Sequence, residues 1–225
     1  MNINRYSLRA LALLLTYPDK DLRGQLPQLL AAIDAEGAVP AARRTELLAL
    51  ATELTRLDAY EIESRYVETF DRGRATSLHL FEHVHGDSRD RGPAMIDLVQ
   101  TYEKAGLLLG PDELPDHLCV VLEFASTQPP KLAREFLGEM AHVLTAIFSA
   151  LLQRGSPYAA VVAAVLELAG QKVQAVPIEA EEPVDDVWAE PVVFDGCSTR
   201  GQAKPGAPQP IHIVRKNAAQ KGVTI

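Results

Sequence analysis

The stretch that organises this chain runs from residue 66 to residue 126 and reads YVETFDRGRATSLHLFEHVHGDSRDRGPAMIDLVQTYEKAGLLLGPDELPDHLCVVLEFAS. It holds four of the six histidines of the chain. Tyr66 and Phe70 lie four positions apart in it, a spacing that puts two side chains on one face of a helix. Because polar and aromatic residues gather here, we expect the other segments before residue 170 to be helices that support this stretch.

The composition is that of a globular protein with an acidic surface. The chain has 225 residues, of which 47% are hydrophobic, enough for one large helical domain and a tail or for two small domains. A core of this size folds without a metal or a disulfide. The net charge of −8 argues against a nucleic-acid partner, which would need clustered lysine and arginine. It fits either a basic partner or solubility alone.

The N-terminal residues raise the question of a targeting or membrane segment. The apolar run 10–15 is short, lacks a small-residue cleavage site and ends at Tyr17-Pro18, as a buried helix would. No segment approaches the roughly 20 apolar residues that cross a bilayer. The two cysteines, Cys119 and Cys197, form neither a disulfide framework nor a paired zinc spacing. We therefore expect a cytoplasmic protein without stable membrane insertion.

The spacing of apolar residues predicts the fold class. They recur with a helical period up to residue 168, and no segment before residue 170 alternates like a strand. The sequence predicts an all-α fold, a single helical-bundle domain of seven to nine helices over residues 1–170. We expect Pro27 to break the second segment into two short pieces. The expected helical segments are 4–17, 20–35, 40–57, 58–70, 77–83, 93–105, 115–127, 130–153 and 156–168.

The composition changes after Gly170. Residues 171–225 are rich in proline and, up to residue 190, in acidic residues, a pattern typical of a largely disordered tail. One patch, at 187–188 and 191–194, is apolar enough to dock on a surface. We therefore divide the chain into a helical domain over 1–170 and a Pro-rich acidic tail over 171–225.

A pair of histidines is the best hint of enzymatic chemistry. His79 and His83 are four apart in the expected helix 77–83, and two histidines at this spacing can share a metal ion. Glu82 could act as a base, but local spacing places no third ligand. A metal-dependent hydrolase that uses His79 and His83 is therefore one hypothesis. The alternative is that these histidines hydrogen-bond carboxylates and cap loops.

The Glu-Leu-Pro-Asp-His run at 113–117 has a mechanical interpretation. We expect Pro115 to take the first position of a helix, where its missing N–H costs nothing. Asp116 would then favour the positive end of that helix's dipole, and His117 would hold the preceding turn. Either this run is simply a helix start, or it is a hinge or pocket edge, with Glu113 and Pro115 as the hinge residues.

Motifs of catalysis are missing from the sequence. It has no glycine-rich phosphate loop, no nucleophile elbow and no cysteine pair. Tyr66 and Phe70 fit a core stripe, although a buried tyrosine hydroxyl needs a partner. We therefore predict no catalytic residue, no resident metal and no enzyme.

Taken together, these segments resemble the NarJ-type nitrate reductase assembly chaperones, a branch of the redox-enzyme maturation proteins that include TorD and DmsD. The run at 113–117 is similar to the hallmark of the wider family. The strings at 66–71, 77–83 and 86–92 are similar to the nitrate reductase branch in particular. The resemblance extends over residues 1–170.

The resemblance implies an all-helical cytoplasmic chaperone that is absent from the finished enzyme. It would bind the N-terminal segment of the apo α subunit of respiratory nitrate reductase and hold it while the molybdenum cofactor is inserted. It would also delay docking of that subunit onto the membrane. The cofactor would pass into the client, so no cofactor is expected on this chain. A helical scaffold or regulator is the third hypothesis.

A basic amphipathic helix as client would need an apolar groove with an acidic rim. We expect aromatic side chains to supply the apolar contacts and carboxylates to supply the charge. His117 would tune the affinity with pH, because histidine titrates near ~6.5. The candidate peptide-binding residues are Tyr66, Glu68, Phe70, Phe81, Glu82, Asp116 and His117.

Overall fold

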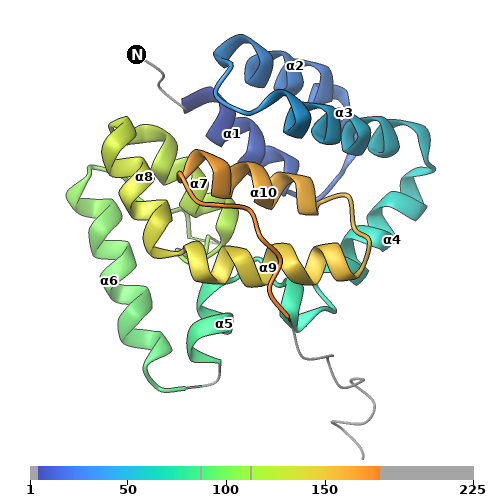
Figure 1. Cartoon of the computed structure of the whole chain (residues 1–225). Helices are drawn as coiled ribbons and strands as arrows, with labels where there is room; N and C mark the ends of the chain where they lie inside the picture. The colour runs from blue at the N-terminus through green and yellow to red at the C-terminus, as the bar shows by residue number, and fades with distance from the viewer. Residues whose placement is uncertain (1–4, 87, 112, 178–225) are drawn as a thin grey trace, which may run out of the picture. The chain divides into compact units, whose positions relative to one another are not determined.

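The computed structural model describes residues 5–86, 88–111 and 113–177. Over these residues the chain forms ten α-helices, one 3₁₀ turn and no strand, which confirms the all-α fold class (Figure 1). There is one helix more than expected, because segment 130–153 forms two helices. The elements are α1 (Arg5–Leu14), α2 (Lys20–Glu36), α3 (Ala41–Arg56), α4 (Ala59–Phe70), the turn Arg74–Thr76, α5 (Leu80–His85), α6 (Arg91–Lys104), α7 (Leu118–Thr127), α8 (Pro130–Glu139), α9 (Ala141–Gln153) and α10 (Ala159–Leu168).

The core is built around the apolar helices α1, α7 and α10. In α10 every side chain except Glu167 is buried, as expected for a helix that is apolar on all sides. This helix packs against α1, α3, α8 and α9, and α1 packs against α2 and α7. Glu167 lies at the margin of the core, where Arg43 of α3 approaches it to 3.1 Å.

Pro27 does not divide α2, contrary to the expectation of two short pieces. The helix is continuous and ends at Glu36, one residue beyond the expected segment, before Gly37, whose φ of 65° is easy only for glycine. Pro27 is exposed, whereas Leu26 and Leu29 beside it are buried. The hydrogen bond that proline removes therefore lies on the solvent side, and the buried apolar face holds both halves in one helix.

The expected helix 130–153 is instead two helices, α8 and α9, bent by 67°. The break is at Met140, two residues after Gly138, which is a poor helix former. Leu137 before the break and Leu144 after it are both buried, so the bend keeps both apolar faces on the core. Within the described part of the chain, no single helix is long and apolar enough to span a bilayer, and this bent pair meets those criteria only jointly.

The first turn of α1 is capped by the last residue of α2. The Glu36 carboxylate accepts hydrogen bonds from the backbone N–H groups of Tyr6, at 3.1 Å, and Ser7, at 2.8 Å. A negative charge at this end also interacts favourably with the helix dipole. The contact closes the α1–α2 hairpin at its open end.

We expect Glu36→Ala to lower the free energy of unfolding by about 1–2 kcal/mol, because two backbone donors lose a charged acceptor. Urea denaturation measures this. Glu103→Ala on the exposed face of α6 is the control, and we expect it to change stability by less than about 0.5 kcal/mol. Equal effects of the two substitutions would contradict the capping role.

A second apolar cluster attaches α6 to the body of the domain. Leu98 and Tyr102 of α6 are buried with Phe124 of α7, and the Tyr102 and Phe124 ring centroids are 4.6 Å apart. Phe81 of α5 packs at the edge of this cluster. α6 is thus held by this small core, whereas α5 also reaches the main core through the buried Leu80.

The last described residues, 171–177, are not helical. The backbone N–H of Val176 donates to Ser149 Oγ of α9 at 3.0 Å, and Val173 packs on the main core. This segment therefore passes across α9, as Figure 1 shows. The remainder of the predicted acidic tail, including Trp188 and the patch at 191–194, lies outside the described residues.

Candidate functional site

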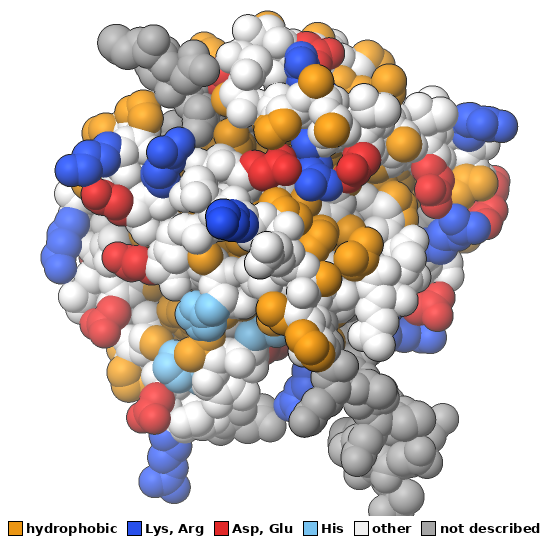
Figure 2. Space-filling view, in the orientation of Figure 1, with side chains coloured by type: hydrophobic (Ala, Val, Ile, Leu, Met, Phe, Trp, Pro, Cys, Tyr) orange, Lys and Arg blue, Asp and Glu red, His pale blue; other side chains and the backbone are white. Residues whose placement is uncertain are grey.

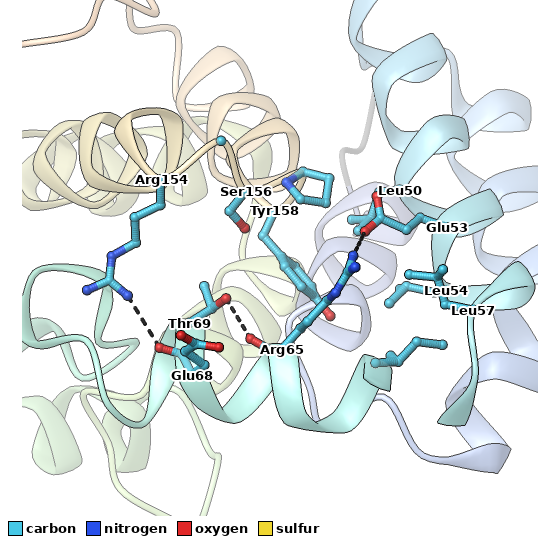
Figure 3. Close-up of a pocket in the computed structure, with 13 residues that line it drawn as sticks. Leu50, Glu53, Leu54, Leu57, Arg65, Glu68, Thr69, Arg154, Ser156 and Tyr158 are labelled. Atoms are coloured by element: carbon cyan, nitrogen blue, oxygen red, sulfur yellow. Dashed lines mark hydrogen bonds and ion pairs between the residues drawn. The ribbon is translucent and has the colours of Figure 1, made fainter. Parts of the chain in front are cut away.

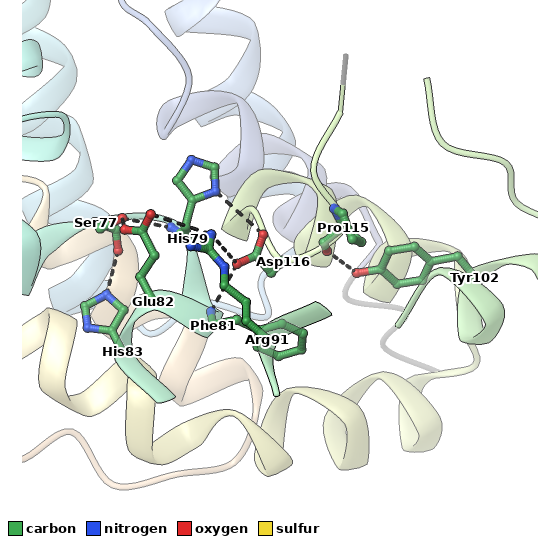
Figure 4. A network of polar contacts seen from close by, with 9 residues as sticks. All are labelled: Ser77, His79, Phe81, Glu82, His83, Arg91, Tyr102, Pro115 and Asp116. Atoms are coloured by element: carbon green, nitrogen blue, oxygen red, sulfur yellow. Dashed lines mark hydrogen bonds and ion pairs between the residues drawn. The ribbon is translucent and has the colours of Figure 1, made fainter. Parts of the chain in front are cut away.

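The structure distributes the expected site residues over two places. Tyr66 and Phe70 belong to the main core, with Glu68 exposed between them on α4. Phe81 belongs to the second apolar cluster. Glu82 and Asp116 lie near Phe81, in a network of polar contacts where α5 meets the start of α7 (Figure 4). The ring of His117, next to Asp116, packs edge-on against His79.

A short backbone pairing brings the two halves of this network together. His79 and His117 form an isolated antiparallel bridge. The N–H of Leu80 donates to the Asp116 carbonyl at 3.0 Å, and the N–H of Leu118 donates to the Leu78 carbonyl at 2.8 Å. The segment before α5 and the segment before α7, nearly forty residues apart in sequence, are thereby fixed side by side.

Asp116 is the centre of the network. Its side chain is 0% exposed, and its Oδ2 accepts a hydrogen bond from the Phe81 N–H at 3.1 Å. His79 Nδ1 lies 3.6 Å from Oδ1, and Arg91 lies 3.9 Å from Oδ2. These two distances are those of ion pairs and are too long for hydrogen bonds. Asp116 therefore caps the first turn of α5 and not the helix that follows it in sequence.

The 113–117 run does not begin a helix, contrary to expectation, since α7 starts at Leu118 with His117 as its N-cap residue. Pro115 is buried in the preceding turn, where its carbonyl accepts the Tyr102 hydroxyl at 2.7 Å. Glu113 is exposed and accepts the N–H of Gly110 at 2.7 Å. Pro115 therefore anchors α6 through Tyr102.

The spacing argument for a shared metal ion between His79 and His83 is wrong. His79 precedes α5, as its N-cap residue, so the two side chains do not project from one helix face. His83 Nε2 lies 2.9 Å from the Ser77 carbonyl, and Ser77 Oγ donates to Glu82 at 2.6 Å. In the parts of the chain that the structure describes, no group of three or more His, Cys, Asp or Glu side chains is placed to hold a metal.

The network shifts the proton affinities of its members. Asp116 raises the pKa of His79 against the opposing effect of partial burial. Burial alone would raise the pKa of Asp116, but His79, the Phe81 N–H and Arg91 together hold it below its usual value. Burial, together with the charge of His79, lowers the pKa of His117. At neutral pH the buried carboxylate is therefore ionised.

The contribution of Asp116 to stability should depend on pH. Because the pKa of His79 is raised on folding, the stability from this pair is fully present below ~6.5, the unfolded value, and is lost as pH rises through the folded value. Asp116→Asn should therefore lower the free energy of unfolding more at pH 5.5 than at pH 8.5. The loss at pH 5.5 should exceed the loss at pH 8.5 by roughly 0.5–1 kcal/mol. Urea denaturation at the two pH values measures this. In a His79→Gln background the pH dependence should shrink, and an unchanged dependence would contradict the pairing.

Tyr66 and Phe70 are buried on one face of α4, as their helical spacing indicates, and Ile62 is buried on the same face. The Tyr66 hydroxyl donates to the Leu15 carbonyl at 2.7 Å, which ties α4 to the end of α1. The Tyr66 and Phe70 rings pack edge-on against Tyr158, with centroids 6.0 and 5.0 Å away. These two rings therefore support Tyr158 from behind.

Tyr158 lines a cavity of about 610 Å³ that we call the α3–α4 pocket (Figure 3). Its apolar walls come from the facing sides of α3 and α4, and the turn between α9 and α10 closes the remaining side. The lining residues are Leu50, Glu53, Leu54, Leu57, Ile62, Arg65, Glu68, Thr69, Arg154, Gly155, Ser156, Pro157 and Tyr158. Figure 2 shows hydrophobic side chains in the region bordered by these elements.

Charged groups of both signs line the α3–α4 pocket. Arg65 is paired with Glu53 at 2.9 Å, and Arg154 donates to the backbone carbonyl of Glu68 at 3.3 Å. Arg154 also lies over Gly73, where a β-carbon would come within 2.7 Å of its guanidinium. The Glu68 carboxylate itself is exposed at the edge. The arrangement can receive an apolar side chain and offer a carboxylate beside it.

Of the residues that line this pocket, only Glu68 was named as a candidate from the sequence. The apolar residues of α3 gave no signal of a pocket, because periodicity shows that a helix face is apolar and not whether a neighbour covers it. The turn 154–158 carries no motif. Ser156-Pro157 was the sole local signal, and it was interpreted as a helix start.

The model of the nitrate reductase delta subunit family matches residues 20–164. The chain is 41% identical over 187 residues to the nitrate reductase molybdenum cofactor assembly chaperone NarJ of Escherichia coli K12, a match that covers 79% of each chain. This protein belongs to the nitrate reductase delta subunit family.

Two further relatives have names of the same kind. NarW of Escherichia coli K12, a probable nitrate reductase molybdenum cofactor assembly chaperone, is 36% identical and is matched over 80% of its length. The probable chaperone NarJ of Bacillus subtilis is 33% identical, over 67% of this chain and 80% of its own. A solved structure, a putative redox enzyme maturation protein from Archaeoglobus fulgidus, superposes with a TM-score of 0.51 at 23% identity. It covers 74% of this chain and 94% of its own, and it shares the fold.

Proposed function

We propose that this protein is an assembly chaperone of a respiratory nitrate reductase. It binds the N-terminal region of the apo α subunit, holds that subunit while the molybdenum cofactor is inserted, and delays its docking onto the membrane. The cofactor enters the client and is not held by this chain. The chaperone works in the cytoplasm, without nucleic acid and without inserting into the membrane.

One observation carries this proposal: delta subunit relatives named as nitrate reductase molybdenum cofactor assembly chaperones match about four fifths of this chain and of their own length. Identity of 41% over most of the domain supports a client of the same kind for this chain. The function needs no catalytic group, because a chaperone acts by binding one conformation of its client and then releasing it.

We propose that the client segment binds in the α3–α4 pocket. An amphipathic helix binds by placing apolar side chains, one turn apart, in an apolar groove. Leu57, which is half-buried, offers apolar surface above the buried side chains of Leu54 and Ile62, and Glu68 offers a carboxylate at the edge. The net charge of −8 favours a basic segment and speeds its encounter with the pocket.

The other candidate residues take indirect roles in this proposal. Tyr66 and Phe70 set the position of Tyr158 at the pocket wall. Contact of a peptide with Asp116 would require α5 to move, because Asp116 is fully buried beneath that helix. We therefore propose that Phe81, Glu82, Asp116 and His117 fix the α5–α6 corner, with Glu113 and Pro115 as the ends of the hinge on which it turns.

The decisive experiment is calorimetry with a synthetic peptide of the first fifteen or so residues of the α subunit. Saturable binding at one peptide per chain supports the proposal. Pull-down from cells grown on nitrate without oxygen then separates a chaperone from a helical scaffold, since a chaperone should retain the α subunit before cofactor insertion and lose it afterwards.

We expect Leu57→Asn to weaken binding of this peptide roughly five- to tenfold, because an apolar wall of the pocket becomes polar with little change of shape. Leu132→Asn on the exposed face of α8 is the matched control, with an unchanged dissociation constant. Both variants are first checked for helicity and for an unchanged melting temperature within a few degrees. Equal affinity of wild type and both variants would mean that the client segment binds elsewhere.

A further inference from the structure

A separate pocket of about 340 Å³ lies along α4, between that helix and the residues that follow α1. We call it the tyrosine pocket. Glu68 lines both this pocket and the α3–α4 pocket, so the two meet at α4. The residues that line the tyrosine pocket are Tyr17, Tyr60, Glu63, Ser64, Val67, Glu68 and Arg72.

Two exposed aromatic rings form its walls. Tyr60 is 84% exposed and Tyr17 is 45% exposed, although aromatic side chains of this size are usually buried. Tyr17 is nevertheless held in place, because its hydroxyl donates to Glu63 at 3.0 Å and its ring packs edge-on against Tyr66 at 5.6 Å. The pocket thus has one fixed wall and one projecting wall.

The lining of the tyrosine pocket carries more acidic than basic residues. Two acids, Glu63 and Glu68, and one cation, Arg72, line it. Desolvation, the hydrogen bond to Glu63 and the charges of Glu63, Asp71 and Asp19 raise the pKa of Tyr17.

We propose that the tyrosine pocket receives one arginine or lysine side chain of the client segment, a proposal that rests on the function proposed above. A cation is attracted to the face of a tyrosine ring and forms charge-assisted hydrogen bonds with a carboxylate. Both partners are present here within one cavity. Because Glu68 borders both pockets, a client that places an apolar side chain in the α3–α4 pocket can reach the tyrosine pocket across α4.

The test uses calorimetry at low salt with two synthetic peptides. One is the first fifteen or so residues of the α subunit, and the other carries uncharged analogues in place of its lysines and arginines. We expect Glu63→Gln and Tyr60→Ala each to weaken the first peptide about threefold, and the double variant to weaken it about tenfold. Binding of the uncharged peptide should be the same for all variants. The glutamine retains an oxygen that can accept the Tyr17 hydroxyl.

Glu103→Gln on α6 is the control, because it removes the same charge from a remote exposed position and should leave both peptides unaffected. If wild type binds the first peptide and the double variant binds it equally well, the cation pocket is refuted while the chaperone function stands. The cation pocket is likewise refuted, and the chaperone function stands, if the double variant loses affinity for both peptides equally. If wild type binds neither peptide, the proposed function and this inference both fail.

Discussion

Tyr66→Ala should lower the free energy of unfolding by about 3–5 kcal/mol, the usual cost of truncating a buried aromatic side chain. Tyr66 packs against Tyr17, Phe70 and Tyr158, and its hydroxyl satisfies the Leu15 carbonyl at the end of α1. Tyr66→Phe keeps the ring and should cost only about 1–2 kcal/mol, from that unpaired carbonyl. Urea denaturation measures both.

The Tyr66 series also separates two roles for this residue. Tyr60→Ala on the same helix is the control for stability, because an exposed side chain should change it by less than about 0.5 kcal/mol. If Tyr66 supports the pocket from behind, Tyr66→Phe should bind the α-subunit peptide within about threefold of wild type. If Tyr66 itself binds the client, the affinity of Tyr66→Phe for this peptide should fall by clearly more than threefold, and our placement of the binding site would be wrong.

Asp116→Ala should lower the free energy of unfolding by about 2–3 kcal/mol, because the buried Phe81 N–H loses a charged acceptor and His79 and Arg91 lose their counter-ion. Asp116→Asn keeps an oxygen acceptor and should cost less, about 1 kcal/mol. Asp97→Ala, on the exposed side of α6, is the control, with a change below about 0.5 kcal/mol.

Hydrogen exchange adds a local measurement to the Asp116 series. Because Asp116 caps α5, the amide of Phe81 should lose protection in Asp116→Ala, whereas amides of α10 should follow only the global loss of stability. Uniform loss over the whole domain would show that Asp116 acts on the fold in general. A variant as stable as wild type would contradict the capping role itself.

The sequence by itself determined the helical fold and several of its helix boundaries. The helical spacing of Tyr66 and Phe70 placed both on one face of α4, and both are buried. The expected segment 20–35 agrees with α2 to within one residue at its end. These predictions hold because each depends on residues within about four positions of one another, where helix geometry fixes which groups can meet. The motifs in 66–126 also indicated the family.

The tertiary structure decided which partner each of these groups meets. Asp116 was predicted to serve the helix that follows it, yet it caps α5, 35 residues earlier, because a backbone bridge at His79 and His117 brings that helix beside it. The same bridge takes His79 out of α5 and separates it from His83. The α3–α4 pocket needs α3, α4 and the turn at 154–158, segments up to about a hundred residues apart. Packing of apolar faces alone sets such distances, and no local pattern in the sequence records them.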